Sequence, residues 1–215
     1  MERIVTTTTE RQTLGEDKVR VSLTLPALPE KAQTPLQKSF SKYYGGMRSG
    51  FLRFAKESLL KRAANQNVPF GAVLKAVVSY ENKSVVSVYV DAAVSTGDAR
   101  TITRLPQLWD KKSGTLIRTE ALFLKRAKSA LMPLLEKSAI SRAESAAVPL
   151  YSDWRVLLNK HFDKKAFYLS PRGLAFIYSA GVLSDKNEVF PVHVAQNDLT
   201  AVLKESAYAS FWGEE

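Results

Sequence analysis

The stretch from Phe167 to Tyr178 reads Phe-Tyr-Leu-Ser-Pro-Arg-Gly-Leu-Ala-Phe-Ile-Tyr. Aromatic and aliphatic residues stand on both sides of Ser-Pro-Arg-Gly, and a proline followed closely by a glycine is typical of a tight turn. Two short apolar runs joined by such a turn indicate a β-hairpin. The stretch therefore predicts two aromatic strands in the C-terminal half of the chain.

A second group of elements is expected before this hairpin. Residues 18–25 alternate between polar and apolar side chains, which is typical of a half-buried strand. Thr34, Pro35 and Gln37 match a helix start with a capping box, so a long helix is expected from there to about Asn65. Three strands with short turns between them then predict an antiparallel meander, at 72–80, at 85–94 and from about 102 to 109.

The remaining elements complete an α+β fold. We expect a helix over 122–147, in which Pro133 should cause a kink or a break, and a short helix over 154–161. A last strand at 189–195 and a short helix over 199–206 follow the aromatic hairpin. This order predicts an antiparallel sheet, made of the meander and the hairpin, with helices packed on one side, one of them the long helix of the N-terminal half.

The length of the chain suits one large domain or two small modules that share a core, because it has 215 residues. We expect an N-terminal module at 1–110 and a C-terminal module at 111–215, joined in one compact unit. Cysteine is absent, which excludes a disulfide framework, thiolate zinc sites and a cysteine nucleophile. Because His161 and His193 are the only histidines, no metal site and no cofactor is predicted.

The charge of the chain is its strongest compositional signal. A net charge of +10 favours anionic partners, namely a cell-wall polymer, a membrane surface or nucleic acid. The first ten residues lack the apolar segment of a signal peptide, and no window approaches 18 uninterrupted apolar residues, so no transmembrane segment is expected. The chain is therefore expected to be cytoplasmic as it stands, or extracellular with an anchor removed.

The aromatic hairpin resembles the "F-Y-L-T-P-x-G-L-x-F-Y" hairpin of the RsiV-like, or PdaC-type, domain family. This family occurs in the ectodomain of a lysozyme-responsive anti-sigma factor and in some peptidoglycan deacetylases. Residues 85–123 are similar to the family's succession of strands and turns. The segments of this chain that match the family's motifs are 95–100, 110–114 and 121–123. The strand that ends at Pro26, with a long helix after it, is similar to the family's opening segment. The three matches occur in the family's order and span most of the chain.

The chain departs from the family pattern in two loops, 95–101 and 179–187. Arg100 stands where the family carries a histidine, and Asp98 replaces a glycine. The second loop lacks the family's tyrosines and prolines. The resemblance implies a non-catalytic binding or sensing domain of a bacterial cell-envelope protein that contacts lysozyme or peptidoglycan. Familiar lysozymes are strongly basic, so like-charge repulsion favours anionic wall material over lysozyme as the partner of this chain.

Candidate binding residues lie near the altered turn and in the hairpin. Arg100 and Arg104 share one face of a strand, and with Trp109 nearby they could hold an anionic polymer through guanidinium contacts and stacking. Asp98 and Tyr178 complete the predicted binding set. No catalytic constellation is recognisable, so the chain is not expected to be an enzyme. Two alternatives stay open: a cytoplasmic protein that binds nucleic acid or another polyanion, and an accessory domain of a cell-wall enzyme.

Overall fold

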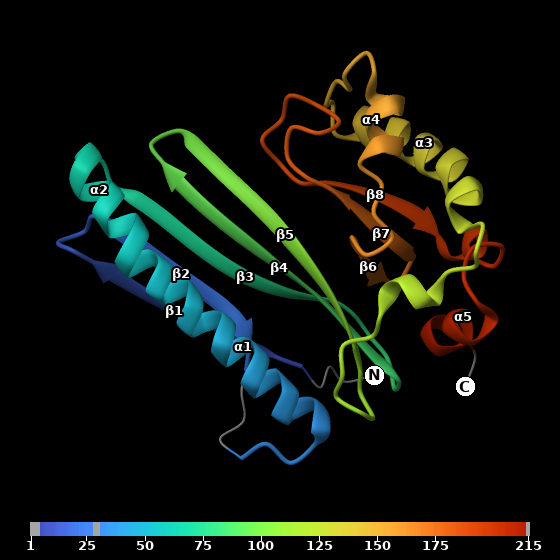
Figure 1. The fold of residues 1–215 in the computed structure, drawn as a ribbon, viewed down its shortest axis with the longest axis horizontal. Helices are drawn as coiled ribbons and strands as arrows, with labels where there is room; N and C mark the ends of the chain where they lie inside the picture. The colour runs from blue at the N-terminus through green and yellow to red at the C-terminus, as the bar shows by residue number, and fades with distance from the viewer. Residues whose placement is uncertain (1–4, 28–30, 214–215) are drawn as a thin grey trace. The chain divides into compact units, whose positions relative to one another are not determined.

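The fold combines two sheets with several helices, one of them long (Figure 1). The computed structural model describes residues 5–27 and 31–213. The predicted α+β class and the long helix are confirmed. The chain divides into two compact units, which share the strands β3, β4 and β5. Unit 1 comprises Met1–Val78, Tyr89–Leu105 and Lys111–Thr115, and unit 2 comprises Ser79–Val88, Pro106–Asp110 and Leu116–Glu215.

The larger sheet has five strands in the order β1-β2-β3-β4-β5. Their bounds are Thr7–Leu14, Val19–Pro26, Phe70–Glu81, Val85–Thr96 and Ala99–Asp110. β1 pairs antiparallel with β2, whereas β2 pairs parallel with β3, so the sheet is mixed. The last three strands match the predicted meander. The sequence did not predict β1, because its threonine-rich residues show no alternation of apolar side chains and it pairs with the sheet on one side only.

The parallel pairing of β2 with β3 follows from the long helix between them, because parallel neighbours need a crossover connection. α1 (Pro35–Phe54) continues through a π-helical segment (Ala55–Leu59) into α2 (Leu60–Gln66). The predicted capping box is present: the Gln37 N–H donates to Thr34 Oγ1 over 3.2 Å, and the Thr34 N–H donates to Gln37 Oε1 over 3.1 Å. The helix ends at Gln66, close to the predicted end at about Asn65, and its C-cap residue Asn67 has the left-handed conformation.

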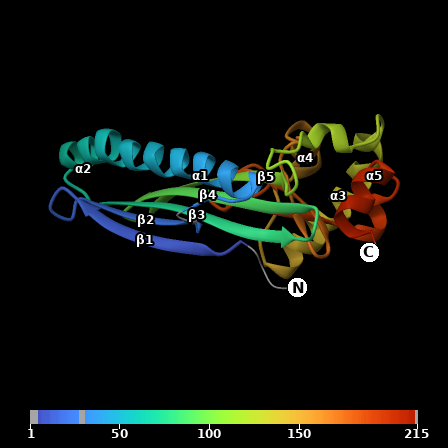
Figure 2. The same ribbon diagram turned by 90° about the horizontal axis from the view of Figure 1, so that it is seen from below.

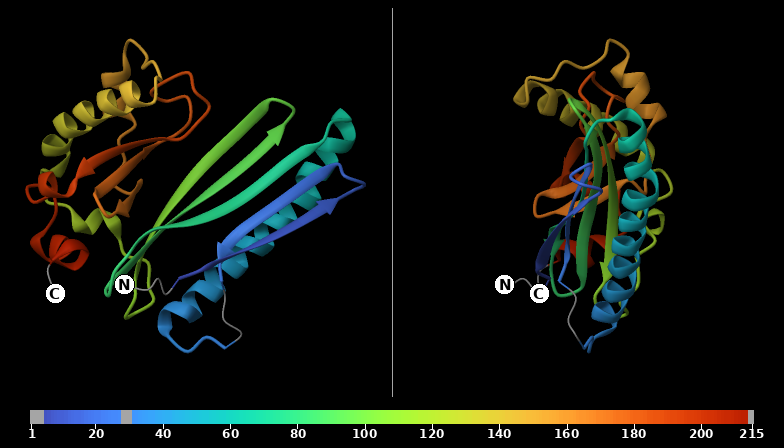
Figure 3. Two further views of the ribbon diagram at one scale, coloured as in Figure 1. Left: turned by 180° about the vertical axis from the view of Figure 1, so that it is seen from behind. Right: turned by 90° about the vertical axis from the view of Figure 1, so that its left-hand side faces the viewer.

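In unit 1 the long helix covers one face of the five-stranded sheet. Figure 2 shows α1 and α2 lying along that face, and the right-hand view of Figure 3 shows the same arrangement. Apolar residues of β2 and β3 alternate toward the helix and are buried. They include Val19, Val21, Leu23, Ala72 and Leu74, and the helix contributes Leu36, Phe40, Tyr44 and Leu59. The opposite face carries the polar residues of the same strands.

The smaller sheet belongs to unit 2 and confirms the aromatic hairpin. β6 (Phe167–Ser170), β7 (Gly173–Tyr178) and β8 (Phe190–Ala195) pair antiparallel in that order. The hairpin turns through the two residues between β6 and β7. α3 (Ala127–Ser145) contacts β8 and covers the sheet, while α4 (Trp154–Lys160) and α5 (Glu205–Trp212) complete the unit. Two 3₁₀ turns lie at Thr119–Leu122 and Gln196–Leu199.

Two helices of unit 2 differ from the expectation. Pro133 does not break α3, which runs continuously from Ala127 to Ser145. Because proline has no N–H group, the Ser129 carbonyl receives no helical hydrogen bond from position 133. Pro133 and Ser129 are both exposed, so water can donate to that carbonyl instead. The last helix is α5, which begins at Glu205, near the end of the segment 199–206 where it was predicted.

Phenylalanine rings form the centre of the unit 2 core. Phe176 of β7 lies 5.7 Å from Phe167 of β6, 5.5 Å from Phe162 and 6.2 Å from Phe123, measured between ring centroids. α3 adds Leu131 and Leu135, whose side chains are fully buried. The aromatic residues of the hairpin are therefore core residues, and their contacts hold β6 and β7 against the rest of unit 2.

Ser87 is a buried polar residue that joins β4 to β6 within unit 2. Its hydroxyl oxygen accepts the Leu169 N–H over 2.9 Å and lies 3.0 Å from the Ser79 hydroxyl. A Ser87→Ala substitution leaves the buried Leu169 N–H without this acceptor, so the free energy of unfolding should fall by about 1–3 kcal/mol. Urea unfolding followed by tryptophan fluorescence measures this loss, because Trp109, Trp154 and Trp212 all belong to unit 2.

Ser79→Ala is the matched control for this prediction. It removes the partner hydroxyl but leaves the Leu169 N–H bonded to Ser87, so a loss below about 1 kcal/mol is expected. Equal losses in the two variants would contradict the role assigned to the Ser87 hydroxyl.

Candidate anion-binding surfaces

The structure places three of the predicted binding residues on the β4–β5 hairpin of unit 1. Asp98 lies in its turn, and Arg100 is exposed on β5. Arg104 is more enclosed: its Nε and Nη2 atoms donate to Asp91 over 2.7 and 2.8 Å, and its guanidinium carbon lies 4.0 Å from the centroid of the Tyr89 ring. Only 14% of its side chain is exposed. Arg104 is thus held in place by a carboxylate and a ring.

The other two predicted residues are buried in unit 2. Trp109 is 3% exposed and Tyr178 is 2% exposed, so neither offers a free ring face for stacking in this structure. The Tyr178 hydroxyl donates to the Leu158 carbonyl oxygen over 3.2 Å, and burial raises the pKa of this phenol. The five predicted residues therefore do not gather at one place. The binding role of each stays a prediction.

A basic surface lies on the face of the five-stranded sheet that points away from α1. We name it the basic sheet face and define it by five cationic residues: Arg11, Arg20, Lys75, Arg100 and Arg104. Alternate residues of a strand point to the same side, and cross-strand contacts fix which side this is. The Thr9 and Thr24 hydroxyls lie 3.1 Å apart, and Thr24 stands beside Lys75 in the sheet register.

The other strands connect to the basic sheet face in the same way. Arg20 stands beside Gly71 in the register, and the Ser95 hydroxyl lies over Gly71 from β4. Asp91 is four residues from Ser95 on the same strand, and it bonds Arg104 on β5. Arg11, Arg20 and the exposed Val73 also line a shallow hollow of about 360 Å³ on this face. The five cations are therefore spread over four strands of one continuous surface.

Opposing charge on the basic sheet face is sparse. Among the described strand residues of unit 1 that point to this side, Asp91 is the only acidic one, and it already pairs with Arg104. Other acidic residues, Glu16, Asp17 and Asp98, lie in the turns at the strand ends. Arg11, Arg20 and Lys75 are exposed and form no ion pair within the described part of the chain. The hydroxyls of Thr9, Thr13, Ser22, Thr24 and Ser95 lie between the cations.

The net charge of the chain is concentrated in unit 1. This unit holds 17 Lys and Arg residues against 8 Asp and Glu residues, whereas unit 2 holds 14 against 13. Of the total of +10, unit 1 therefore carries +9 and unit 2 carries +1. The composition alone could not show this asymmetry, because the residues of unit 1 come from three separate segments of the sequence.

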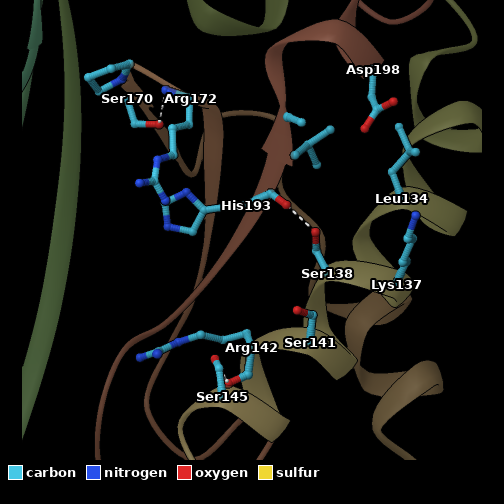
Figure 4. Close-up of a pocket in the computed structure, with 13 residues that line it drawn as sticks. Leu134, Lys137, Ser138, Ser141, Arg142, Ser145, Ser170, Arg172, His193 and Asp198 are labelled. Carbon is cyan, nitrogen blue, oxygen red and sulfur yellow. Dashed lines mark hydrogen bonds between the residues drawn. The ribbon is translucent and has the colours of Figure 1, made fainter.

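A pocket of about 700 Å³ lies in unit 2 between α3, β8 and the turn of the aromatic hairpin (Figure 4). We name it the α3–β8 pocket. α3 contributes the residues of one helix face, from Leu134 to Ser145, while Arg172 comes from the turn and His193 from β8. The Ser138 hydroxyl donates to the His193 carbonyl oxygen and fixes this edge strand against the helix. Sequence reasoning missed the pocket, although Arg172 stands within the motif quoted first.

Positive charge surrounds the histidine of this pocket. Arg172 extends toward the His193 ring from the turn, and Arg142 extends from α3 (Figure 4). Partial withdrawal from water lowers the pKa of His193, and the positive charges of Arg142 and Arg172 lower it further. Asp198 is the one carboxylate among the lining residues, and Lys137 adds another cation. The ring is therefore predominantly neutral at neutral pH, beside two guanidinium groups.

The described residues contain no group of three or more histidine, cysteine or acidic side chains placed to hold a metal ion. No helix in the described part of the chain is both long enough and apolar enough to cross a membrane. The chemistry that these surfaces offer is the binding of anions by guanidinium, ammonium and hydroxyl groups.

Comparisons with known proteins define the fold. No protein-family model matches the chain, and no curated protein matches it in sequence. Among the solved structures that share its fold are two proteins of the DUF3298 family. One comes from Pseudomonas aeruginosa PAO1, with a TM-score of 0.61, 12% sequence identity and coverage of 96% of this chain and 94% of that chain. The other comes from Bacteroides fragilis NCTC 9343, with a TM-score of 0.59, 13% identity and coverage of 94% and 92%.

Proposed function

We propose that this chain is a non-catalytic binding or sensing domain of a bacterial cell-envelope protein, and that unit 1 holds an anionic cell-wall polymer on the basic sheet face. The observation that carries the proposal is the placement of five cations on one open sheet face, in a unit with a net charge of +9. An extended polyanion gains one weak contact at each exposed cation of this face, and Arg11, Arg20, Lys75 and Arg100 are exposed, so affinity comes from their number.

The fold and the motifs favour the cell envelope as the setting. The likeness to two bacterial DUF3298 proteins supports a bacterial domain fold. The motif resemblance to RsiV-like domains points to lysozyme or peptidoglycan as the partner class. A basic lysozyme would meet the basic sheet face with like charge, which slows and weakens association. Anionic wall material is the partner that the charge of unit 1 complements.

Nucleic acid fits the basic sheet face less well. Proteins that bind single strands combine a positive groove with exposed aromatic rings on which bases stack. The only aromatic residue among the described residues of this face is Tyr89, and the Arg104 guanidinium already covers its ring. The face is thus rich in cations and hydroxyls but poor in stacking surfaces.

Co-sedimentation with purified peptidoglycan sacculi tests the proposal. The parent protein should be retained at low and at physiological salt, and duplex DNA should not displace it at the higher salt. Neutralising Arg20, Lys75 and Arg100 together to Gln should weaken retention about tenfold or more, because each exposed charge contributes up to about 1 kcal/mol. All three side chains are exposed, so the variant should keep its fold.

The matched control removes the same number of positive charges from the helix side of unit 1. Lys38, Lys42 and Lys56 are exposed on the long helix, and their triple substitution to Gln should leave retention close to that of the parent. Equal weakening by both triple variants would mean that net charge, not the basic sheet face, determines binding. Absence of retention, or full displacement by DNA, would refute the wall-polymer proposal.

A further inference from the structure

The α3–β8 pocket gathers positive charge that the protein itself does not neutralise. Arg142 and Arg172 form no ion pair within the described residues, although both act on the His193 ring. Asp198 lies near Leu134 and Lys137 rather than between the two arginines (Figure 4). The Arg172 guanidinium beside the neutral imidazole, and that of Arg142 elsewhere in the lining of the same pocket, are hydrogen-bond donors that lack a negative partner.

The rest of the lining is suited to an apolar group. Leu134, Pro171, Val194 and Ala195 line the pocket together with the helix-face serines. Its volume of about 700 Å³ falls in the range of pockets that hold small organic molecules, of about 300–1,000 Å³. A site with a cationic end and an apolar wall selects a molecule that has one anionic group and one apolar part.

We propose that the α3–β8 pocket binds a small organic oxyanion, a carboxylate or a phosphate monoester carried on an apolar body, with the anionic group between Arg142 and Arg172 beside His193. The inference does not depend on the proposed function, because the pocket belongs to unit 2 and the basic sheet face to unit 1. Variants in one unit leave the other surface intact, so the two proposals can fail separately.

The two histidines of the chain make this proposal measurable. An NMR pH titration of the imidazole protons reports His193 in the pocket and His161 outside it, at the end of α4. A bound anion would offset the positive charge of the arginines, so binding should raise the pKa of His193 and leave that of His161 unchanged. The charged groups that line the pocket with this ring are Lys137, Arg142, Arg172 and Asp198.

The probes are hexanoate, hexyl phosphate, inorganic phosphate and hexanol, each titrated into the full chain at constant ionic strength. A saturable rise of the His193 pKa is expected with hexanoate or hexyl phosphate. The probe that binds more tightly shows whether the pocket prefers a carboxylate or a phosphate monoester. Inorganic phosphate should bind at least about tenfold more weakly, because it lacks the apolar body. Saturable binding of hexanol, or a response of His161 equal to that of His193, would overturn the proposal.

Variants test the assigned residues directly. Arg142→Gln and Arg172→Gln should each weaken binding of the stronger probe about tenfold, because each removes a charge-assisted hydrogen bond. Without any probe, both substitutions should also raise the pKa of His193. Lys125→Gln, which makes the same charge change at an exposed site outside the pocket, should alter neither quantity. Absence of a saturable His193 response with both hexyl probes would refute the site.

Discussion

A Gly173→Ala variant is expected to lose about 3–5 kcal/mol of unfolding free energy, because it combines backbone strain with a steric clash. Gly173 begins β7 with φ at +138°, a conformation that residues with a side chain rarely adopt. A Cβ atom there would lie 2.1 Å from the Val194 carbonyl oxygen and 2.8 Å from the Gln196 nitrogen. Both are backbone atoms at the end of β8, so relief of the clash would break the pairing of β7 with β8.

The measurement is urea unfolding followed by tryptophan fluorescence, which reports unit 2. Gly181→Ala is the matched control in the same unit, because Gly181 also has a positive φ, of +74°, but a Cβ there would meet no atom within 4 Å. The Gly181→Ala variant has the backbone strain without the steric clash, so its free energy of unfolding should fall by only about 1–2 kcal/mol. Losses of similar size in the two variants would show that the close approach of β8 is not the cause.

Local signals in the sequence predicted the elements of this fold well. The turn at Pro171 and Arg172, the capping box at Thr34 and the alternation over 18–25 each depend on residues that are near one another in the chain. The partner of a strand is not a local property, because period-two alternation is the same in parallel and antiparallel strands. This explains why the parallel pairing of β2 with β3 and the edge strand β1 were not foreseen.

The candidate sites were harder to predict than the fold, for the same reason. Trp109 and Tyr178 were chosen as possible stacking residues, but an aromatic side chain serves a core equally well, and only tertiary packing decides between the two. Arg100 and Arg104 do share a face of one strand, as expected from their spacing. Their neighbours Arg20 and Lys75 join that face only through strand pairing, which the sequence does not encode locally.

The α3–β8 pocket depends on even more distant residues. Arg142, Arg172 and His193 come from a helix, a turn and a strand that lie 21 or more positions apart in the sequence. Each residue by itself is an ordinary exposed charge or an isolated histidine, and no spacing rule connects them. Their electrostatic effect on one another appears only once α3 is packed on β8. The sequence could therefore supply the charge of this protein but not the location of its two candidate anion-binding surfaces.

A Phe176→Ala variant should lower the free energy of unfolding of unit 2 by about 3–5 kcal/mol, the usual cost of emptying a core phenylalanine site. Phe176 is 1% exposed, and its ring contacts three other phenylalanine rings, so its loss leaves a cavity that the hairpin cannot fill without moving β6 or β7. Tyr151→Ala removes an aromatic side chain that is 37% exposed in the same unit and should cost less than about 1 kcal/mol. If urea unfolding gave equal losses for both variants, the aromatic hairpin would not be the centre of the unit 2 core.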